Sequence, residues 1–425
     1  MTRTKHQGLR LVAAVAALSM FAVACGGGDD ASPAETTSAP SSAAEVTDAP
    51  VTDAPVTDAP TDTTAEAGTS AAVGEGEGEV NLIAWAGYVE DGSTDPAVDW
   101  VTPFEDKTGC KVNVQLGNSS DEMVQLMQTG EYDGVSASGD ATLRLIAGGE
   151  VAPVDVDQIP NYADVFDDLK LQRHNSVDGV PYGVPHGRGA NLLVYNTDLY
   201  TTAPDSWGEM FDADSAAAGS ISVYDSPIYI ADAALYLAAT EPDLGIENPY
   251  ALDQTQFDAA IALLDQQKAN AGQYWSLYTD QQAALEGGTV LAGTTWQVIV
   301  NLAEANGAKI DAVKPTEGAT GWSDTWMISS EAKHPNCMYM WMDHIISPEA
   351  NAEVAEWFGE APSNRASCDL TADAEHCATY HADDTAYWND VWYWTTPEET
   401  CLDGRTDTTC VPYSEWVNAW NGLRS

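Results

Sequence analysis

The sequence predicts an α/β protein of two lobes, each built on a central sheet flanked by helices and joined to the other by two strands. From residue 80 onward, short apolar runs alternate with amphipathic segments, and this order predicts parallel sheets covered by helices. Residues 80–425 exceed the size of one typical domain, which indicates two. Apolar runs near 190–196 and 311–320 lead out of the first lobe and back, and two such crossings form a hinge.

The first lobe begins with segments in the order β-α-β-α-β. They are strands at 80–85, 110–116 and 132–136, with helices at 100–106 and 120–129 between them. Ligands bind beyond the carboxyl ends of parallel strands. The residues that directly follow two of these strands, 85–88 and 138–140, are therefore expected at a binding edge.

The second lobe continues the alternation of strands and helices. It comprises strands at 190–196, 220–225, 290–296 and 309–313, with helices at 230–239, 257–267 and 298–306. A strand at 322–329 and a helix at 338–346 then return the chain to the first lobe. The expected division is 80–193 and 316–425 for the first lobe and 194–315 for the second.

The first 24 residues have the pattern of an export signal. Three basic residues precede the apolar run 11–24, which is too short for a stable membrane span. The small residue just before Cys25 resembles the lipobox of bacterial lipoproteins, whose cysteine sulfur carries a diacylglycerol. We therefore expect a signal peptide at 1–24, a lipid anchor on Cys25 and no other attachment to the membrane. The alternative is an ordinary cleaved signal followed by a chance cysteine.

Residues 25–79 are expected to form a disordered acidic tether behind the anchor. The segment contains near-repeats of VTDAP, and from residue 26 it has no aromatic and no basic side chain. Such a composition buries too little apolar surface to offset the chain entropy lost on folding. A tether of this kind lets the folded part leave the membrane surface and return to it.

Six cysteines remain if Cys25 carries the lipid, and an even number in an exported protein predicts disulfides. Two pairs are nine residues apart, which suits local bridges. The remaining two form a long-range pair, because the helix from residue 338 is expected beside the helix that stops at Gly109. The expected bridges are Cys110 with Cys337, Cys368 with Cys377, and Cys401 with Cys410.

Charge and motifs limit the function classes. The formal net charge of −50, from 16 basic and 66 acidic residues, excludes nucleic acid as a partner because phosphates would be repelled. We interpret most of these carboxylates as a solvated acidic surface, which would attract a cation. The chain has no Gly-x-Ser-x-Gly, His-Glu-x-x-His or P-loop motif, so we expect no enzyme and no cofactor.

One cluster of cysteine, histidine and acidic residues allows an alternative interpretation as a metal site. The cluster consists of His376, Cys377, His381, Asp383 and Asp384. Its spacing matches no standard zinc pattern, so we expect no metal.

A series of short segments runs in a fixed order from residue 85 to residue 348. The segments are 85–88 (WAGY), 104–109 (FEDKTG), 132–133 (YD), 179–185 (GVPYGVP), 191–196 (NLLVYN), 206–207 (SW), 293–296 (GTTW), 314–318 (KPTEG), 321–324 (GWSD) and 347–348 (SP). In this order they resemble the spermidine/putrescine-binding proteins of bacterial ABC transporters. The resemblance covers 80–365, and the tail more loosely. It implies the type II periplasmic-binding-protein fold, with two lobes and a two-strand hinge.

The resemblance also implies a ligand site, in which aromatic side chains enclose the chain of an amine and carboxylates bind its ammonium ends. Carried over by position, the expected ligand contacts are Trp85, Tyr88, Ser138, Asp140, Asp225, Trp296, Trp322, Asp324 and Glu360. Trp322 and Asp324 match a Trp-x-Asp pair that clamps an amine. Residues two apart on a strand point to one side, so both are expected to meet the same ligand end. Asp225 and Trp296 are expected to face them from the second lobe.

Four positions depart from the family pattern. Asp140 and Glu360 stand where the family has tyrosines, Ile228 where it has a second acid, and Arg188 where it has a tryptophan. One carboxylate is lost and two are gained, so the expected ligand is a polyamine or a related cationic amine. Arg188 either lines the cleft or pairs with a neighbouring acid.

The resemblance implies an exported, monomeric receptor in the periplasm or on the outer face of the cell membrane. Its partners would be a small cationic amine and a cognate ABC permease and ATPase. One alternative is a receptor for another solute, such as choline or betaine, an amino acid, or an iron or thiamine compound. An alternative from a different class is a secreted glycan-active or glycan-binding protein, because paired acids are frequent in the sequence.

Overall fold

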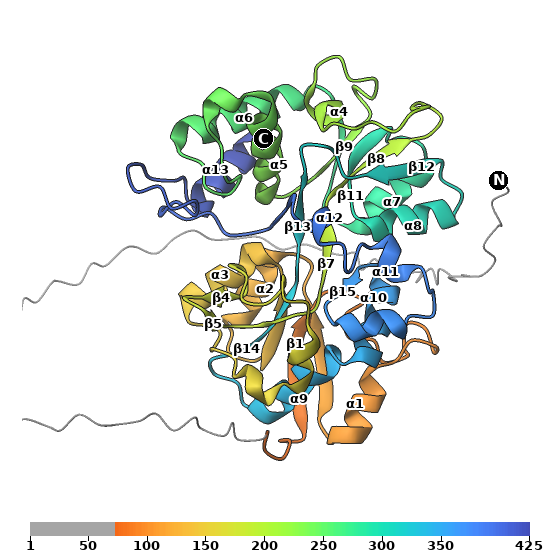
Figure 1. Cartoon of the computed structure of the whole chain (residues 1–425), viewed down its shortest axis with the longest axis vertical. Helices are drawn as coiled ribbons and strands as arrows, with labels where there is room; N and C mark the ends of the chain where they lie inside the picture. The colour runs from red at the N-terminus through yellow and green to blue at the C-terminus, as the bar shows by residue number, and fades with distance from the viewer. Residues whose placement is uncertain (1–72) are drawn as a thin grey trace, which may run out of the picture. The chain divides into compact units, whose positions relative to one another are not determined.

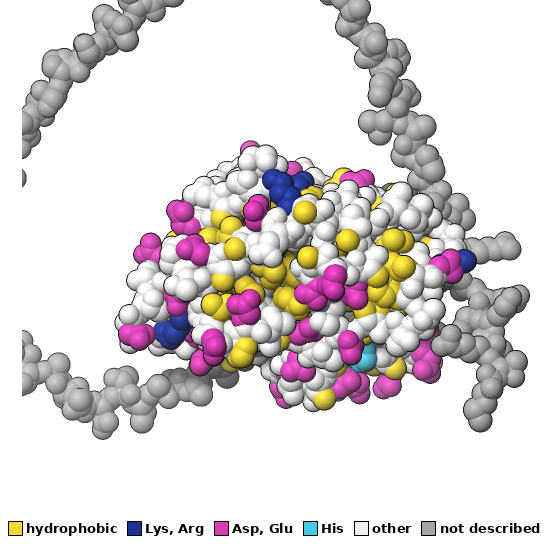
Figure 2. Space-filling view, turned by 90° about the horizontal axis from the view of Figure 1, so that it is seen from above, with side chains coloured by type: hydrophobic (Ala, Val, Ile, Leu, Met, Phe, Trp, Pro, Cys, Tyr) yellow, Lys and Arg dark blue, Asp and Glu magenta, His cyan; other side chains and the backbone are white. Residues whose placement is uncertain are grey.

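The computed structural model describes residues 73–425. The expected signal peptide, Cys25 and most of the expected tether lie outside this part of the chain. Within it, no helix is both long enough and apolar enough to cross a membrane. Asp and Glu side chains are spread over the face drawn in Figure 2, where Lys and Arg are few.

The first lobe is built on a five-stranded sheet with the order β2-β1-β3-β14-β6. Its strands are β1 (Glu79–Ala84), β2 (Lys111–Leu116), β3 (Gly134–Ala137), β6 (Val184–Pro185) and β14 (Thr325–Ile328). The first three are parallel, as expected, and β14 runs antiparallel to both of its neighbours. The helices are α1 (Val101–Thr108), α2 (Ser120–Met127), α3 (Gly139–Gly148), α9 (Pro335–Ile345) and α10 (Pro348–Phe358). A small hairpin joins β4 (Ser176–Val177) to β5 (Val180–Pro181).

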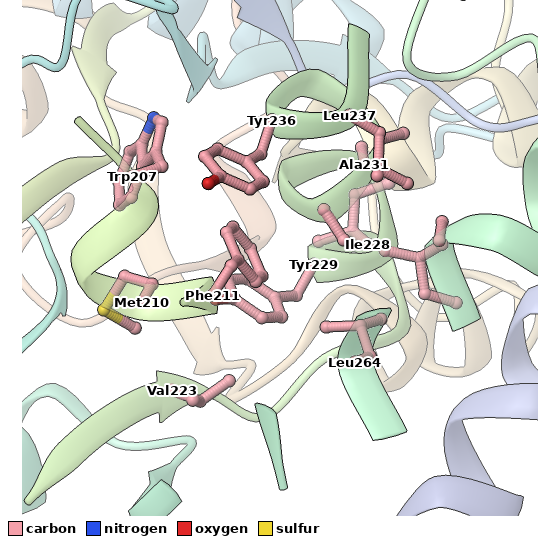
Figure 3. Close-up of a cluster of buried hydrophobic side chains, with 14 of the residues drawn as sticks. Trp207, Met210, Phe211, Val223, Ile228, Tyr229, Ala231, Tyr236, Leu237 and Leu264 are labelled. Atoms are coloured by element: carbon pink, nitrogen blue, oxygen red, sulfur yellow. The ribbon is translucent and has the colours of Figure 1, made fainter. Parts of the chain in front are cut away.

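The second lobe has its own five-stranded sheet, with the order β10-β9-β11-β8-β12. Its strands are β8 (Leu192–Asn196), β9 (Ile221–Tyr224), β10 (Ala271–Trp275), β11 (Ala292–Thr295) and β12 (Ile310–Val313). Its helices are α4 (Gly208–Phe211), α5 (Ile230–Thr240), α6 (Gln254–Gln267), α7 (Tyr278–Glu286) and α8 (Gln297–Ala305). Figure 3 shows part of its core, where the Phe211 ring stacks on Tyr236 with 5.1 Å between centroids.

Two crossing strands connect the lobes, as the sequence predicted. They are β7 (Gly187–Ala190) and β13 (Ala319–Trp322), which pair antiparallel in a third sheet with the order β15-β7-β13-β16. The outer strands are β15 (Ala361–Pro362) and β16 (Val391–Tyr393). Figure 1 shows β7 and β13 running between the two sheets of the lobes.

The prediction of a single strand at 322–329 is wrong. Strand β13 ends at Trp322, and β14 begins at Thr325 in a different sheet. Asp324 therefore lies on the short link between two sheets. Its direction is set by this change of sheet and not by the alternation of one extended strand.

The C-terminal helix packs in the second lobe and not in the first, where the sequence analysis placed it. Helix α13 (Tyr413–Arg424) packs against α6, beside which it is drawn in Figure 1. Its residues Trp416 and Trp420 lie four apart, on one helical face, and both are buried in the second-lobe core. The tail thus contributes to the second lobe, although 316–425 was expected in the first. For the rest of the chain the division remains a proposal.

The structure contains the three expected disulfides. The Cα atoms are 5.8 Å apart in Cys110–Cys337, 5.7 Å in Cys368–Cys377 and 5.1 Å in Cys401–Cys410. The long-range bridge joins the end of α1 to the start of α9, which is the proximity assumed from the sequence. Cys377 is bonded to sulfur, and the described residues contain no group of His, Cys, Asp and Glu placed to hold a metal. The metal interpretation therefore receives no support.

The last residues of the expected tether belong to the folded body. The Glu77 carboxylate accepts hydrogen bonds from the backbone N–H groups of Asn336 (3.0 Å) and Cys337 (2.9 Å), in the first turn of α9. The preceding residue His334 makes no side-chain cap there. Partial burial acts to raise the pKa of Glu77, but these donors bring it below its ordinary value. A carboxylate is favourable at a helix N-terminus, which explains why Glu77 belongs to the folded body although it precedes the expected boundary at residue 79.

Replacing Glu77 by Ala should lower the free energy of unfolding by about 1 kcal/mol, because it removes the cap of α9. Denaturant unfolding of the oxidised protein at neutral pH measures this change. The matched control is Glu75→Ala, since Glu75 is exposed two residues earlier. Equal changes in the two variants would show that the contact with α9 contributes nothing.

Candidate ligand-binding site

A group of buried polar side chains lies where β1, β3 and the hinge strands end. The Tyr88 hydroxyl donates a hydrogen bond to Asp324 Oδ2 (2.7 Å) and is 3.4 Å from Glu360 Oε2. The Ser138 hydroxyl donates to Asp324 Oδ1 at 2.5 Å. With His186, these four residues form what we call the acid cluster. The structure thus brings together four residues that the sequence placed in the site: Tyr88, Ser138, Asp324 and Glu360.

His186 completes the acid cluster as a neutral ring whose Nε2 has no hydrogen-bond partner. The indole N–H of Trp326 donates to His186 Nδ1 (2.9 Å), so this nitrogen carries no proton. The proton of the neutral ring is therefore on Nε2, which lies 3.3 Å from Glu360 Oε1. Burial lowers the pKa of His186 to about 3, so the ring stays uncharged at neutral pH. The sequence analysis missed His186, although a polar residue between β6 and a crossing strand was a usable signal.

Both acids of the cluster are buried without a cation. No Lys or Arg of the described chain forms an ion pair with either carboxylate. Burial raises the pKa of Asp324 to about 6, although the hydroxyls of Ser138 and Tyr88 act to lower it. Burial and the charge of Asp324 raise the pKa of Glu360 well above its ordinary value. Both raised pKa values favour a proton on the pair, and a cation could replace that proton.

Two other predicted residues of the first lobe lie beside the cluster. Trp85 follows β1 and is half-buried, and its indole N–H has no hydrogen-bond partner. Asp140 is buried in the first turn of α3, where its carboxylate accepts a hydrogen bond from the Ser120 hydroxyl at 2.9 Å. Burial raises the pKa of Asp140. The charge of the nearby Arg144 acts to lower this pKa, but the effect of burial is larger.

The Asp225 carboxylate was expected to be available to a ligand, but it already has partners within the chain. The indole N–H of Trp420 donates to Asp225 Oδ1 at 2.9 Å, and Arg424 Nε donates to the same oxygen at 3.1 Å. Both partners belong to α13, which is nearly two hundred positions away in the sequence. Asp225 thus binds the C-terminal helix, and an amine could use it only by competing with Arg424.

Trp296 and Trp322 line one cavity of about 360 Å³ beside the hinge, which we call the hinge cavity. The indole N–H of Trp296 donates to Asn191 Oδ1 at 2.9 Å. Trp322 is 5% exposed, and its ring lies against Gly189 on the paired strand. Arg188 also lines this cavity, but its guanidinium pairs with Asp168 at 2.7 Å and lies 4.4 Å from the centroid of the Trp388 ring. Arg188 therefore both lines the cavity and pairs with an acid.

A segment of the C-terminal tail fills the space between the lobes on the β16 side. The Trp394 ring stacks parallel to Tyr224 of the second lobe, with 5.8 Å between centroids. The Trp394 carbonyl packs so closely on Gly139 of the first lobe that a β-carbon there would collide with it. The Thr396 hydroxyl donates to the backbone carbonyl of Asp140 at 2.9 Å. The sequence analysis missed Tyr224 and Trp394, because nothing local indicated that the tail returns to the cleft.

The family model and the similar proteins all describe solute-binding proteins. A family model described as bacterial extracellular solute-binding protein matches residues 99–419. The chain is 24% identical over 328 residues to the putrescine/agmatine-binding protein of Pseudomonas aeruginosa, covering 72% of this chain and 84% of that protein. It is 23% identical over 307 residues to the Escherichia coli putrescine-binding periplasmic protein PotF, covering 69% and 80%.

Solved structures of related proteins have the same fold. A putative spermidine/putrescine ABC transporter protein from Listeria monocytogenes superposes with a TM-score of 0.66 at 17% identity, covering 82% of this chain and 99% of that one. The substrate-binding protein PotD from Streptococcus pneumoniae gives a TM-score of 0.64 at 17% identity, with the same coverage. The fold is therefore that of the type II periplasmic binding proteins.

The buried acid should make stability depend on pH. The pKa of Asp324 is about 6 in the folded protein and 3.8 ordinarily, so its stabilising contribution is complete below pH 3.8 and is lost as the pH rises through about 6. The loss is on the order of 3 kcal/mol, since one pKa unit corresponds to about 1.36 kcal/mol. Denaturant unfolding of the ligand-free protein and of Asp324→Asn between pH 4 and 7 measures it. The parent should lose more stability than the variant across this range.

The matched control for this pH experiment is Asp157→Asn, an exposed acid of the first lobe. Its unfolding free energy should follow the parent at every pH. If the difference between the parent and Asp324→Asn stays constant from pH 4 to 7, then Asp324 does not titrate in this range in the folded protein.

Proposed function

The chain belongs to the family of bacterial extracellular solute-binding proteins, and on this premise we propose that it captures a small cationic amine outside the cell. The captured amine would then pass to a cognate ABC permease and ATPase. The family is one of transport proteins and not of enzymes, and its periplasmic relatives indicate an exported protein.

The observation that carries the proposal is the pair of buried carboxylates in the acid cluster. Removing carboxylates from water is costly unless a cation or hydrogen-bond donors compensate them. In the described chain the compensation comes from the hydroxyls of Tyr88 and Ser138, whereas Glu360 Oε1 has no hydrogen-bond partner. An ammonium group has three donors and a positive charge, and it matches the unused acceptor capacity of Asp324 and Glu360.

Aromatic rings near the acid cluster support an aliphatic or cationic ligand. Tyr88 and Phe358 pack edge to face with 4.6 Å between centroids, and Phe358 packs in the same way on Trp322 at 5.8 Å. Rings of this kind stabilise both methylene chains and cations through their faces. Trp85, Asp140, Asp225 and Trp296 remain proposed ligand contacts, with Asp225 shared with Arg424.

The finer features of the proposal rest on the sequence. Lipid anchoring through Cys25 follows from the lipobox-like segment after the signal, and the tether follows from composition. We propose that the receptor acts as a monomer held at the membrane by this anchor. A glycan-active function receives no support from the family.

We expect Asp324→Asn to weaken binding of putrescine and spermidine by well over tenfold, since losing one carboxylate from a buried charge pair costs about 2–5 kcal/mol. Titration calorimetry at pH 7 measures the dissociation constants. Asp157→Asn is the control, because it removes the same charge from the surface of the same lobe and should cause only a small salt-dependent change. Equal small losses in both variants would contradict a role for the acid cluster in amine binding.

A further inference from the structure

The hinge cavity differs in chemistry from the acid cluster. Its walls come from the hinge strands, from the start of α8, and from the tail segment 365–390 with α11 (His376–Thr379) and α12 (Thr385–Trp388). The Cys368–Cys377 bridge closes this segment. None of its lining residues is Asp or Glu, in a chain with 66 acids. The lining residues that can carry charge are Arg188, Lys314 and His381, all of them basic.

Two side chains of the cavity wall have unused hydrogen-bond donor capacity. The indole N–H of Trp322 is buried and has no hydrogen-bond partner. The Lys314 ammonium donates to the Tyr387 carbonyl at 2.6 Å, and its nearest acid, Asp390, is 3.9 Å away. It therefore retains donor capacity. These donors would suit a group with acceptor oxygens and a negative charge.

The start of α8 adds a further preference for an anion. Gln297 is the first residue of this helix and lines the cavity, and the preceding Trp296 provides no side-chain cap. The N-terminus of a helix carries a partial positive charge and unpaired N–H groups. The helix and the unpartnered indole of Trp322 point independently to the same ligand chemistry.

One acid of the acid cluster and one wall residue of the hinge cavity lie on the same face of β7. The Glu360 carboxylate lies against Gly187, and the Trp322 ring lies against Gly189. Residues two apart on a strand share a face and are about 6.4–6.8 Å apart. An acid that suits an ammonium and a donor that suits a carboxylate are thus separated by the length of a short aliphatic chain.

We propose that the solute is an amino carboxylate, whose ammonium binds the acid cluster and whose carboxylate binds in the hinge cavity. This inference rests on the proposed amine-receptor function and narrows its ligand class. A diamine of the same length would place its second ammonium among the basic side chains of the hinge cavity, where no lining carboxylate can pair with it.

Calorimetry with matched ligand pairs tests the inference. The pairs are 3-aminopropanoate with 1,3-diaminopropane, 4-aminobutanoate with 1,4-diaminobutane, and 5-aminopentanoate with 1,5-diaminopentane. At the length that binds best, the amino carboxylate should bind at least about tenfold more tightly than its diamine, because only its anionic end finds charged donors.

Two variants test the wall of the hinge cavity itself. Trp322→Phe keeps a ring but removes the unpartnered N–H, and Lys314→Gln removes the ammonium. Each substitution should weaken the binding of the amino carboxylate about five- to tenfold. The affinity for the diamine should stay unchanged or increase. Lys309→Gln is the control, because Lys309 is an exposed lysine of the second lobe paired with Asp198. Lys314→Arg should restore binding, which distinguishes loss of charge from misfolding.

The outcomes separate the two proposals. Diamines that bind as tightly as amino carboxylates, with no selective effect of Lys314→Gln, would overturn the inference and leave the amine receptor intact. If no amine of either series binds the parent protein, the proposed function fails as well. Selective loss of the amino carboxylate in both cavity variants, with restoration by Lys314→Arg, would establish the inference.

Discussion

The close pairing of β7 with β13 is the constraint on which the rest of the structure depends. Trp322 lies opposite Gly189, and Gly321 lies opposite Ala190. A β-carbon at Gly189 would collide with the Trp322 ring, and one at Gly321 would meet the Gly189 carbonyl oxygen and the Val391 side chain. Because these strands have glycines at 187, 189 and 321, the Glu360 carboxylate, the Trp322 indole and strand β16 can pack directly against their backbone. The crossing point of the chain is therefore also the floor of the candidate site.

The acid cluster links this hinge to ligand capture. Asp324 comes two residues after β13, and Glu360 comes directly before β15, so both acids are carried by segments next to the crossing strands. Two buried carboxylates without a cation are costly, whereas a bound ammonium would compensate them. A ligand that contacts both acids thus acts where relative motion of the lobes would be absorbed.

The tail of the chain gives this receptor its particular cleft. Segment 365–390 builds one wall of the hinge cavity, Trp394 fills the space beside β16, and α13 engages Asp225 through Arg424. The Cys401–Cys410 bridge lies where the tail meets the second lobe, at the isolated pairing of Cys410 with Asp253. The tail therefore covers surfaces that the two lobes alone would leave to solvent or ligand, and it reduces the space available for a solute.

The sequence alone determined the features that depend on local pattern. Strand and helix periodicity predicted the two α/β lobes and their crossings, and cysteine spacing predicted the two local bridges, because these properties arise from neighbours along the chain. The long-range bridge followed from the two cysteines that remained and from the expected proximity of two helices. The resemblance to the spermidine/putrescine-binding proteins predicted Tyr88, Ser138, Asp324 and Glu360 as ligand contacts, and these side chains lie together in the structure. Only the tertiary structure decided the break between β13 and β14, the capture of Asp225 by Arg424 and the burial of α13 in the second lobe. These depend on contacts between segments far apart in sequence, where packing and charge pairing across space outweigh any local preference.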